Sequence, residues 1–519
     1  MFNRSGWQAL GISIFVISSY TFNSLVASVG EVKLLVKNAL IIPIDGSGTY
    51  IEEGYLAVGL DGKIIEVGQG AVPERYLEVD AIDVSGKFVM PGFLSGHSHL
   101  YQSPFRGLGA HNTLLGWIYC YHMTYGPYYD ATDLYWFSKH GAMDYLGHGI
   151  TTIYDWTLNS GWTTDQYTDL FRGSLDSGAR ILFGYGADSN KTLEENRDML
   201  KEYLAIIKDE GIDASHPRVP AVWMAGLGLL NGREKSIMEF TLSREFDLPM
   251  QVHYLEEPDP PYVEIQRELF PLYDEMEMMG SQLNFAHFIN VTEPILERTG
   301  ESGTSMVWNP LSNGRLASGL PDIPHYRSCG IEVGMGIDGQ ASADVSDPFE
   351  NMRLGMYAIR MKYQNAEVMM PLDVLRYHTI GTARVLGIDD QVGSLEVGKW
   401  ADFIIVDPRD METSPPIHPI EHAVLTCSVA NLESVYIAGE KVVERGTFLQ
   451  VDHGEVMSEV DWRLERIREK IAVAREEETL DRGIIFPGLD EYQQGTFIDD
   501  LEHPRYGRPA QLAPCCEDE

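Results

Sequence analysis

Five residues with metal-binding or acid–base side chains stand at the ends of apolar segments of this 519-residue sequence. His97 and His99 close one segment, and His253, His287 and Asp338 each close another. In an extended strand, residues two positions apart point to the same face, so His97 and His99 would project together. Imidazoles and a carboxylate suit zinc or iron(II), with one position open for water. Any single histidine could be a buried core residue, but the whole pattern predicts a divalent metal site.

Eight apolar, strand-like segments would carry these residues. They are 88–99, 151–155, 180–186, 219–226, 249–255, 282–288, 304–309 and 331–338. Helical stretches such as 194–208 and 233–246 separate them. Apolar strands that alternate with helices are typical of a parallel sheet covered on both faces, and eight such units fit a closed barrel. The sequence therefore predicts an α/β fold with a (β/α)8 TIM-like barrel over residues 89–394, whose active site lies at the C-terminal strand ends.

The two ends of the chain have a different texture. Short β-patterned segments occupy 32–44, 55–58 and 63–67, and similar segments return at 401–406 and 434–443. Glycine-containing turns separate them, as in hairpins. We expect a small discontinuous β-sandwich domain made from residues 29–88 and 395–452. Residues 453–519 are predicted to form a helical and acidic C-terminal extension.

The N-terminal segment resembles a secretory signal peptide. An uncharged apolar stretch at 9–22 follows Arg4, and small residues follow at 26–28. We expect residues 1–28 to be a signal peptide and the protein to be secreted or in the secretory pathway, with a cytoplasmic location as the alternative. The stretch is too short and serine-rich to predict stable membrane insertion. The net charge of −38 argues against nucleic-acid binding, and homo-oligomerisation is left open.

Several motifs resemble those of the amidohydrolase superfamily, in the branch that contains cytosine, guanine and S-adenosylhomocysteine deaminases and the triazine hydrolases. They occur in the family's order between about residues 32 and 443. The motifs are residues 89–107 with the His-x-His pair, the HxxE at 253–256, Ala286-His287, 309–313 with Leu316, 336–339, and 393–402.

The resemblance implies roles for individual residues. The metal ligands it implies are His97, His99, His253 and Asp338. Glu256 would shuttle protons, His287 would contact the water or the substrate, and Asp338 would also accept a proton in catalysis. Two-metal members of the superfamily use a strand-four lysine as a bridge, whereas segment 219–226 contains no lysine. We therefore expect one divalent metal ion, zinc in preference to iron(II).

The expected activity is metal-dependent hydrolysis of carbon–nitrogen bonds other than peptide bonds. Within that class, the sequence favours deamination of a small-molecule aromatic N-heterocycle by metal-activated water. Release of an alkylamine or a halide, or hydrolysis of a cyclic amide, would use the same attack, and residue spacing does not separate these reactions. A non-catalytic binding barrel would predict a broken ligand set or a missing Glu256, and both are intact.

The candidate substrate contacts are Gln102, Trp117, Trp308 and Asn309. Together with Tyr121, Tyr125, Tyr128 and Tyr129, the two tryptophans would form an aromatic mouth for a flat ring, or else these residues pack under a loop. Deaminases of the family often carry a Pro-x-Glu whose carboxylate holds a ribose. The corresponding residues 127–129 here are Pro-Tyr-Tyr, which weakens the prediction of a nucleoside-like substrate.

Overall fold

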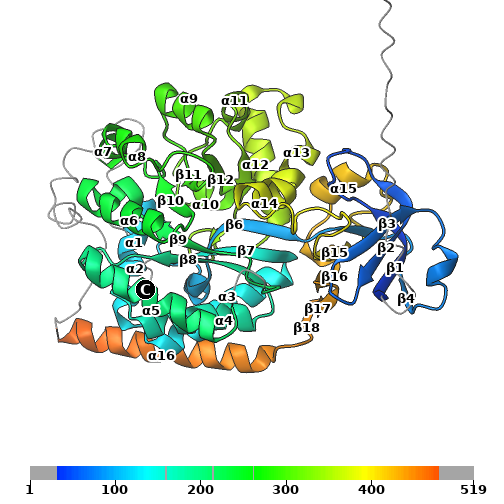
Figure 1. Ribbon diagram of the computed structural model, residues 1–519, viewed down its shortest axis with the longest axis horizontal. Helices are drawn as coiled ribbons and strands as arrows, with labels where there is room; N and C mark the ends of the chain where they lie inside the picture. The colour runs from blue at the N-terminus through cyan, green and yellow to red at the C-terminus, as the bar shows by residue number, and fades with distance from the viewer. Residues whose placement is uncertain (1–31, 158–160, 213–215, 261, 478–519) are drawn as a thin grey trace, which may run out of the picture.

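The computed structural model describes residues 32–157, 161–212, 216–260 and 262–477, which form a barrel and a smaller sheet beside it (Figure 1). The barrel strands are β6 (Phe93–His99), β7 (Ile150–Trp156), β8 (Arg180–Gly186), β9 (Val222–Gly226), β10 (Met250–Tyr254), β11 (Leu283–His287), β12 (Ser305–Trp308), β13 (Val333–Met335) and β14 (Asp338–Gly339). The strands from β6 to β13 pair in this order, β14 pairs with β6, and every pairing among them is parallel.

The barrel closes through an eighth strand that is divided into two pieces. β13 pairs with β12, whereas β14 pairs with β6 and places Asp338 opposite Ser98. The predicted (β/α)8 barrel is thereby confirmed. Because β14 lies against β6, Asp338 is brought directly beside the His-x-His pair at 97–99.

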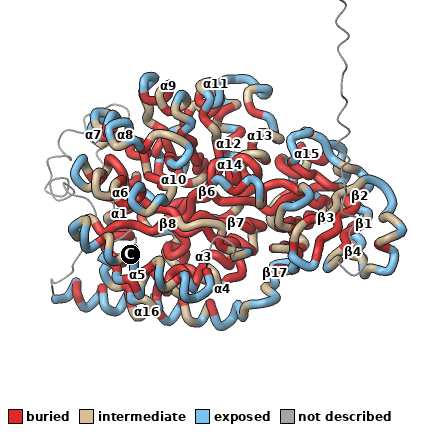
Figure 2. The backbone as a smooth tube through the Cα atoms, in the orientation of Figure 1, coloured by how far each residue is buried: buried red, intermediate tan, exposed pale blue. Residues whose placement is uncertain are grey.

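Helices surround the barrel, and its strands are buried inside them (Figure 2). In chain order they are α1 (Leu114–Cys120), α2 (His122–Tyr125), α3 (Ala131–Gly147), α4 (Thr164–Asp176), α5 (Leu193–Asp209), α6 (Arg233–Glu245), α7 (Tyr262–Glu268), α8 (Pro271–Glu275), α9 (Glu293–Ser302), α10 (Pro310–Arg315), α11 (Ile323–Ser328), α12 (Pro348–Tyr363), α13 (Pro371–Arg376) and α14 (Thr382–Val385). Every residue of β6, β7 and β8 is buried, as expected for parallel strands covered on both faces.

The smaller sheet draws its strands from both ends of the chain, as expected. Its strands are β1 (Val32–Ile41), β2 (Ile51–Gly59), β3 (Ile64–Gln69), β4 (Ala81–Asp83), β5 (Phe88–Pro91), β15 (Phe403–Val406), β16 (Leu432–Ile437), β17 (Glu440–Glu444) and β18 (Thr447–Phe448). They form one mixed sheet in which β5 joins the early strands to the late ones. Val36, Leu56, Phe403 and Tyr436 share a core there, and the Phe403 and Tyr436 rings stack with centroids 4.3 Å apart.

The predicted strand at 88–99 is two strands that belong to different sheets. β5 pairs with β15 in the smaller sheet, and β6 begins the barrel two residues later. Gly92 lies between them, where a Cβ atom would overlap the Thr151 side chain. A glycine is therefore required at the point where the chain passes from one sheet to the other.

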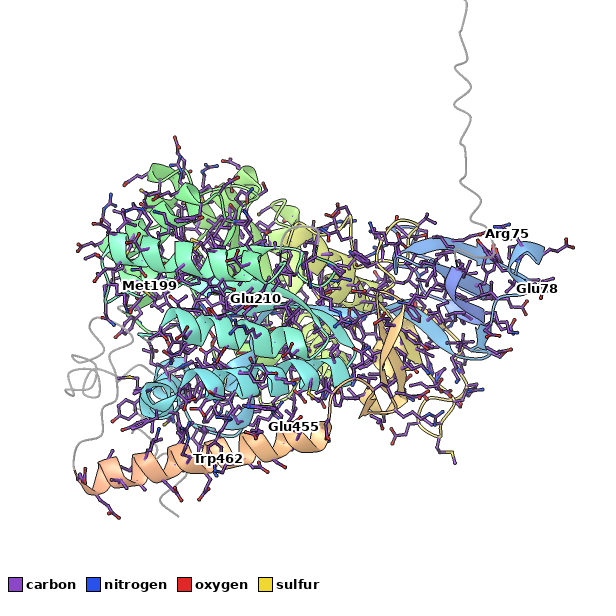
Figure 3. The ribbon with its side chains drawn as sticks, turned by 60° about the horizontal axis from the view of Figure 1, so that its bottom comes forward. Arg75, Glu78, Met199, Glu210, Glu455 and Trp462 are labelled. Carbon is purple, nitrogen blue, oxygen red and sulfur yellow. The ribbon has the colours of Figure 1, made fainter. Side chains whose placement is uncertain are left out.

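A long helix, α16 (His453–Glu476), follows the smaller sheet and returns along the barrel beside α3 (Figure 3). Arg463 and Arg466 both form ion pairs with Asp133 in the first turn of α3, and the Asp133 side chain is fully buried. Residues 478–519 of the predicted extension and the predicted signal peptide lie outside the described residues. Among the described residues, no helix is both long enough and apolar enough to cross a membrane.

Candidate active site

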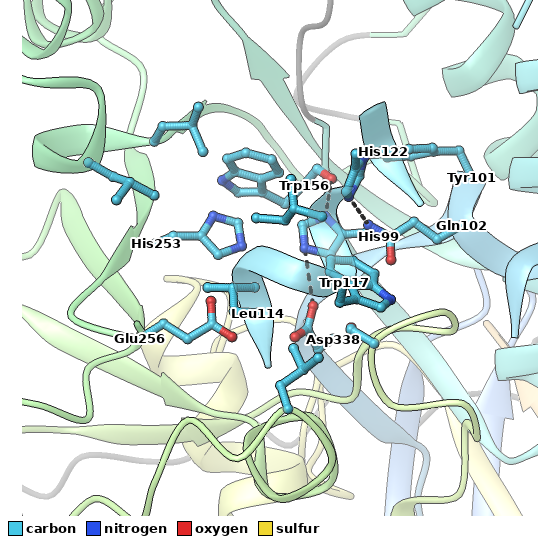
Figure 4. Close-up of a pocket in the computed structure, with 15 residues that line it drawn as sticks. His99, Tyr101, Gln102, Leu114, Trp117, His122, Trp156, His253, Glu256 and Asp338 are labelled. Carbon is cyan, nitrogen blue, oxygen red and sulfur yellow. Dashed lines mark hydrogen bonds and ion pairs between the residues drawn. The ribbon is translucent and has the colours of Figure 1, made fainter. Parts of the chain in front are cut away.

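A cavity lies at the C-terminal ends of the barrel strands (Figure 4). Its described lining consists of His99, Tyr101, Gln102, Leu114, Trp117, Ile118, His122, Trp156, Leu227, Leu230, His253, Glu256, Leu316, Asp338 and Ser342. These residues come from strand ends and from the loops and short helices that follow them. The cavity is thus where the barrel fold concentrates reactive side chains.

Two histidines of β6 are fixed in the same tautomer by acceptors behind them. The Nδ1 atom of His97 lies 2.6 Å from Oε1 of Gln251, and Nδ1 of His99 lies 2.8 Å from the carbonyl oxygen of Trp156. Gln251 is itself oriented, because its Nε2 donates to the carbonyl of Gly96 at 2.8 Å. Since both oxygens accept hydrogen bonds, each ring carries its proton on Nδ1 and leaves the lone pair of Nε2 free.

The free nitrogen atoms converge with two further potential ligands. His97 Nε2 lies 3.1 Å from His253 Nε2, and His99 Nε2 lies 3.1 Å from Asp338 Oδ1. Burial lowers the pKa of His97 and of His253 well below the ordinary value, so both rings are neutral, the form that binds a metal. These histidine and aspartate groups could hold a metal ion, and three imidazoles with one carboxylate fit the coordination chemistry of zinc.

Asp338 is held by hydrogen bonds on every side. Its backbone has a positive φ of 74°, which is unusual for a residue other than glycine. The backbone N–H of Gly339 donates to Oδ1 at 2.7 Å, and Ser312 Oγ donates to Oδ2 at 2.5 Å. The hydroxyl of Tyr145 donates to the Asp338 carbonyl oxygen. These contacts fix the carboxylate beside the histidines despite the strained backbone.

His287, at the end of β11, has the opposite tautomer. Its Nδ1 accepts from Nδ2 of Asn313 at 2.8 Å, and Nδ2 of Asn309 lies 3.4 Å away. Burial lowers the pKa of His287 to about 4, so the ring is neutral and its proton lies on Nε2. That Nε2 is 3.5 Å from Glu256 Oε2 and 3.8 Å from Asp338 Oδ2. His287 therefore presents a hydrogen-bond donor to the site.

Glu256 supplies a buried carboxyl group between the histidines and the cavity. It follows Leu255, which has a positive φ of 55°, and Asn290 Nδ2 donates to the carbonyls of both residues at 3.1 Å. Burial, and then the charge of Asp338, raises the pKa of Glu256 well above its ordinary value. A carboxyl group in such surroundings can hold a proton and release it to a bound molecule.

Comparison with known proteins identifies the family. The amidohydrolase family matches residues 88–442, which include every site residue described above. The chain belongs to the amidohydrolase family. The family prediction made from the sequence motifs is confirmed, and with it the class of hydrolase that acts on carbon–nitrogen bonds other than peptide bonds.

Relatives of this amidohydrolase align with more than four fifths of the chain. It is 25% identical to 5-methylthioadenosine/S-adenosylhomocysteine deaminase 1 of Syntrophus aciditrophicus, over 85% of this chain and 99% of the relative. An adenosine deaminase from Xanthomonas campestris, solved with bound zinc, has a TM-score of 0.74 at 22% identity, covering 84% of this chain and 98% of that one. A mutant of atrazine chlorohydrolase TrzN from Arthrobacter aurescens, complexed with zinc and atraton, has a TM-score of 0.74 at 19% identity, covering 83% and 99%.

The four candidate substrate contacts of this amidohydrolase lie in different places. Gln102 and Trp117 line the cavity, and Trp117 is anchored through its indole N–H, which donates to the Ala341 carbonyl at 2.9 Å. Asn309 is not in the lining and lies behind His287. Trp308 is fully buried and lines a separate cavity beside α12. Neighbouring residues of a strand alternate in direction, so Trp308 faces the helix layer and not the active site.

The tyrosines of the expected aromatic mouth pack under the loop. Tyr121, Tyr125 and Tyr129 surround Phe105, with ring centroids 4.9, 5.0 and 5.7 Å away. They are absent from the described lining of the cavity, as is Tyr128. Of the predicted aromatic residues, only Trp117 lines the cavity. Leu114 and Ile118 of α1 and His122 of α2 also line it, and the sequence did not single them out.

Several residues that build the site were not identified from the sequence. Gln251 could have been found, because it lies two positions before His253 and so on the same face of β10. Asn313 and Ser312 lie in a recognised motif but had no assigned partner. No sequence pattern pointed to His122, because it reaches the cavity only through the turn at Tyr121 between α1 and α2.

Proposed function

We propose that this amidohydrolase holds one divalent metal ion, zinc in preference to iron(II). The ligands would be His97, His99, His253 and Asp338. The observation that carries the proposal is the shared tautomer of His97 and His99, which leaves both Nε2 lone pairs free beside Asp338 and His253. The absence of lysine from β9 supports a single ion, because no bridging group is available there. When bound, the metal lowers the pKa of a water molecule so that hydroxide exists near neutral pH.

The reaction we propose is deamination of an aromatic N-heterocycle. The names of the curated relatives support it, because those that align with 85% of this chain are 5-methylthioadenosine/S-adenosylhomocysteine deaminases. Asp338 accepts one proton from the attacking water, and Glu256 delivers a proton to the ring nitrogen next to the reacting carbon. A second proton transfer to the amino group lets ammonia leave. The Nε2–H of His287 donates to the oxygen that gains negative charge.

Ammonia release measured together with metal content tests this proposal. Purified protein would be loaded with zinc or, in a separate sample, with iron(II), and offered aminopyrimidines, aminopurines and aminotriazines. We expect close to one metal ion per chain, and ammonia in equal amount to the hydroxylated ring product. Two metal ions per chain would contradict the single site. A product that forms without ammonia would contradict deamination but leave the hydrolytic site in place.

We also propose that the mature chain begins near residue 28 or 29 and is found outside the cytosol. The uncharged stretch at 9–22 and the small residues that follow support this. N-terminal sequencing of the protein from its own cells tests it. Recovery of an intact Met1 on cytosolic protein would exclude the cleaved signal peptide.

A further inference from the structure

Three side chains with metal-binding atoms lie together on the outer helices of the barrel. They are Glu293 at the start of α9, His325 in α11 and Cys329 at the end of α11. A carboxylate oxygen, a ring nitrogen and the sulfur atom of these residues all lie within 4.8 Å of one another. None of the three lines the active-site cavity, and none is a proposed catalytic ligand. Any ion that they hold would therefore belong to a second site.

The backbone that carries these groups is fixed by close packing. α9 and α11 lie side by side (Figure 1), and a Cβ atom on Gly300 of α9 would overlap the carbonyl oxygen of Cys329. The Cys329 N–H donates to the carbonyl of His325 at 3.0 Å, so these two residues stand one helical turn apart on the same face. Two ligands separated by three residues on a helix are typical of structural zinc sites. Glu293 supplies the third ligand from the neighbouring helix.

The contact between Glu293 and His325 requires a cation. Nε2 of His325 lies 3.0 and 3.1 Å from the two carboxylate oxygens of Glu293. The other ring nitrogen, Nδ1, lies 3.4 Å from Ser328 Oγ, whose proton is donated to the His325 carbonyl at 2.6 Å. That hydroxyl oxygen can therefore only accept, so Nδ1 carries a proton and Nε2 presents its lone pair to the carboxylate. Two acceptors in contact repel unless a proton or a metal ion lies between them.

The surroundings favour a metal ion in this place. A proton would satisfy the nitrogen and the carboxylate but would leave the sulfur of Cys329 without a role. Thiolate, imidazole and carboxylate together suit zinc and similar divalent transition metals, whereas magnesium and calcium prefer oxygen ligands alone. Arg298 of α9 pairs with Asp274, and Arg327 of α11 pairs with Glu332, so neither arginine neutralises Glu293.

Tyr326 connects this group of ligands to the segment that follows His287. Its hydroxyl donates to the carbonyl oxygen of Phe288 at 3.0 Å and lies 3.3 Å from that of Ile289. The chain then runs only a few residues further to Glu293. An ion bound by Glu293 and α11 would hold the far end of this segment, just as Tyr326 holds the near end.

We propose that Glu293, His325 and Cys329 form a peripheral site for one zinc-like divalent ion, which joins α9 to α11 and braces residues 288–293. On binding, the Cys329 thiol releases its proton to water, and each residue donates one electron pair to the ion. A water molecule completes the tetrahedral shell, because Glu293 and His325 are exposed. The proposal is independent of the proposed catalytic reaction.

This site differs from the proposed catalytic site in strength and in ligand type. It has three protein ligands at an exposed position, so it binds zinc more weakly than four buried ligands do. Gel filtration with a chelator would empty it before the catalytic metal is counted. It also contains the only sulfur atom among the seven residues of the two ligand sets, which gives it a spectroscopic signature of its own.

A cobalt(II) titration tests the proposal. Cobalt bound to a thiolate has a strong charge-transfer band in the near ultraviolet, which histidine and carboxylate ligands do not produce. Metal-free, reduced, full-length protein would be titrated while this band is recorded. We expect the band to saturate at one thiolate-bound cobalt ion per chain. Zinc should then remove the band by displacing cobalt, and magnesium should leave it unchanged.

Variants assign the band to the three residues. Cys329→Ser should abolish it. His325→Ala and Glu293→Gln should each weaken the binding of this cobalt ion by at least about tenfold, the lower limit even for residues that only support a ligand. Glu293 is exposed, so Glu293→Gln tests the site without risk to folding. Glu301→Gln, an exposed carboxylate of the same helix, is its matched control and should leave the affinity unchanged.

The other cysteines provide the second control. Cys120→Ser, and the double variant Cys515→Ser/Cys516→Ser, should keep the band. No band in the wild type, a band that survives in Cys329→Ser, or a band lost in the double variant would overturn the proposal. So would unchanged cobalt affinity in both His325→Ala and Glu293→Gln, because the thiol would then act alone.

Hydrogen exchange tests the bracing role. Zinc added beyond the amount that fills the catalytic site should slow amide exchange in residues 288–293 of the wild type but not of Cys329→Ser. Equal exchange with and without the added zinc would overturn this part. The cobalt band should persist in His97→Ala, so failure of the proposed catalytic site leaves the peripheral site standing, and absence of the band leaves the proposed function standing.

Discussion

Asn313 and His287 form a hydrogen bond of 2.8 Å in which the asparagine amide donates to the ring Nδ1. His97 has the reverse relationship, since its Nδ1 faces the acceptor oxygen of Gln251 at 2.6 Å. One neighbour thus leaves a proton on the inward nitrogen of His287, and the other leaves a lone pair on the inward nitrogen of His97. The partners behind the rings separate a hydrogen-bond donor from a proposed metal ligand among chemically identical side chains.

Replacing Asn313 with aspartate should reverse the tautomer of His287. The new carboxylate would accept from Nδ1, and Nε2 would lose the proton that it offers to the site. We expect kcat/KM to fall by about two powers of ten, comparable to removal of one donor to a developing negative charge. Metal content should remain near the wild-type value, because His287 is outside the proposed ligand set. Wild-type activity in Asn313→Asp would show that the Nε2 proton has no catalytic role.

Replacing Gln251 with leucine should instead weaken metal binding. The substitution removes the acceptor that holds His97 in its metal-binding tautomer, together with the hydrogen bond to Gly96. Changes to such supporting residues typically reduce metal affinity by about 10- to 100-fold. Titration of the apo-protein with zinc in a competing chelator measures this directly. If added zinc restores full activity to Gln251→Leu, the defect lies in affinity and not in the chemical step.

Glu256 and His97 should respond differently to substitution. Glu256→Gln preserves size and leaves the four proposed ligands untouched, so folding and metal content should survive while the rate falls by about two to four powers of ten. His97→Ala removes a proposed ligand, and metal and activity should be lost together. Elemental analysis alongside ammonia release distinguishes the two outcomes. Loss of metal from Glu256→Gln would mean that the carboxyl group supports the site structurally.

The sequence predicted the parts of this fold that depend on periodicity. Continuous apolar segments defined the barrel strands, and the position of His97, His99, His253 and Asp338 at strand ends located the site. The sequence did not predict the division at Gly92, because both halves of that segment are apolar and extended. The sheet to which each half belongs is decided by partners far along the chain, Phe403 to Val406 for one and Ile150 to Trp156 for the other.

Side-chain direction near the site was harder to predict than the site itself. Trp308 and Asn309 are adjacent, yet one faces the helix layer and the other lies behind His287. Their directions depend on where β12 ends, which propensity alone does not fix to a single residue. His122 was missed for a related reason, since a buried histidine at the start of a short helix is recognisable only from the rings and the amide around it.

We expect Glu239 to give the protein a pH-dependent stability that is separate from catalysis. Its carboxylate is 2% exposed and accepts from the backbone of Gly228 at 2.9 Å and from Asn231 Nδ2 at 3.2 Å. Burial raises the pKa of Glu239 from 4.5 to about 7. Between these values the folded protein keeps a proton that the unfolded chain has released, so the free energy of unfolding should fall as pH rises through this window.

Glu239→Gln isolates this contribution because glutamine does not titrate. The variant should be less stable than the wild type at pH 4.5, since an amide N–H then opposes a backbone donor. Its free energy of unfolding should decline less from pH 4.5 to 7. Over that range the wild type should lose on the order of 2 to 3 kcal/mol more than the variant. Urea denaturation of both proteins at half-unit pH intervals measures the two curves. Parallel curves would show that Glu239 is already ionised in the folded protein at pH 4.5, held charged by the N–H groups of Gly228 and Asn231.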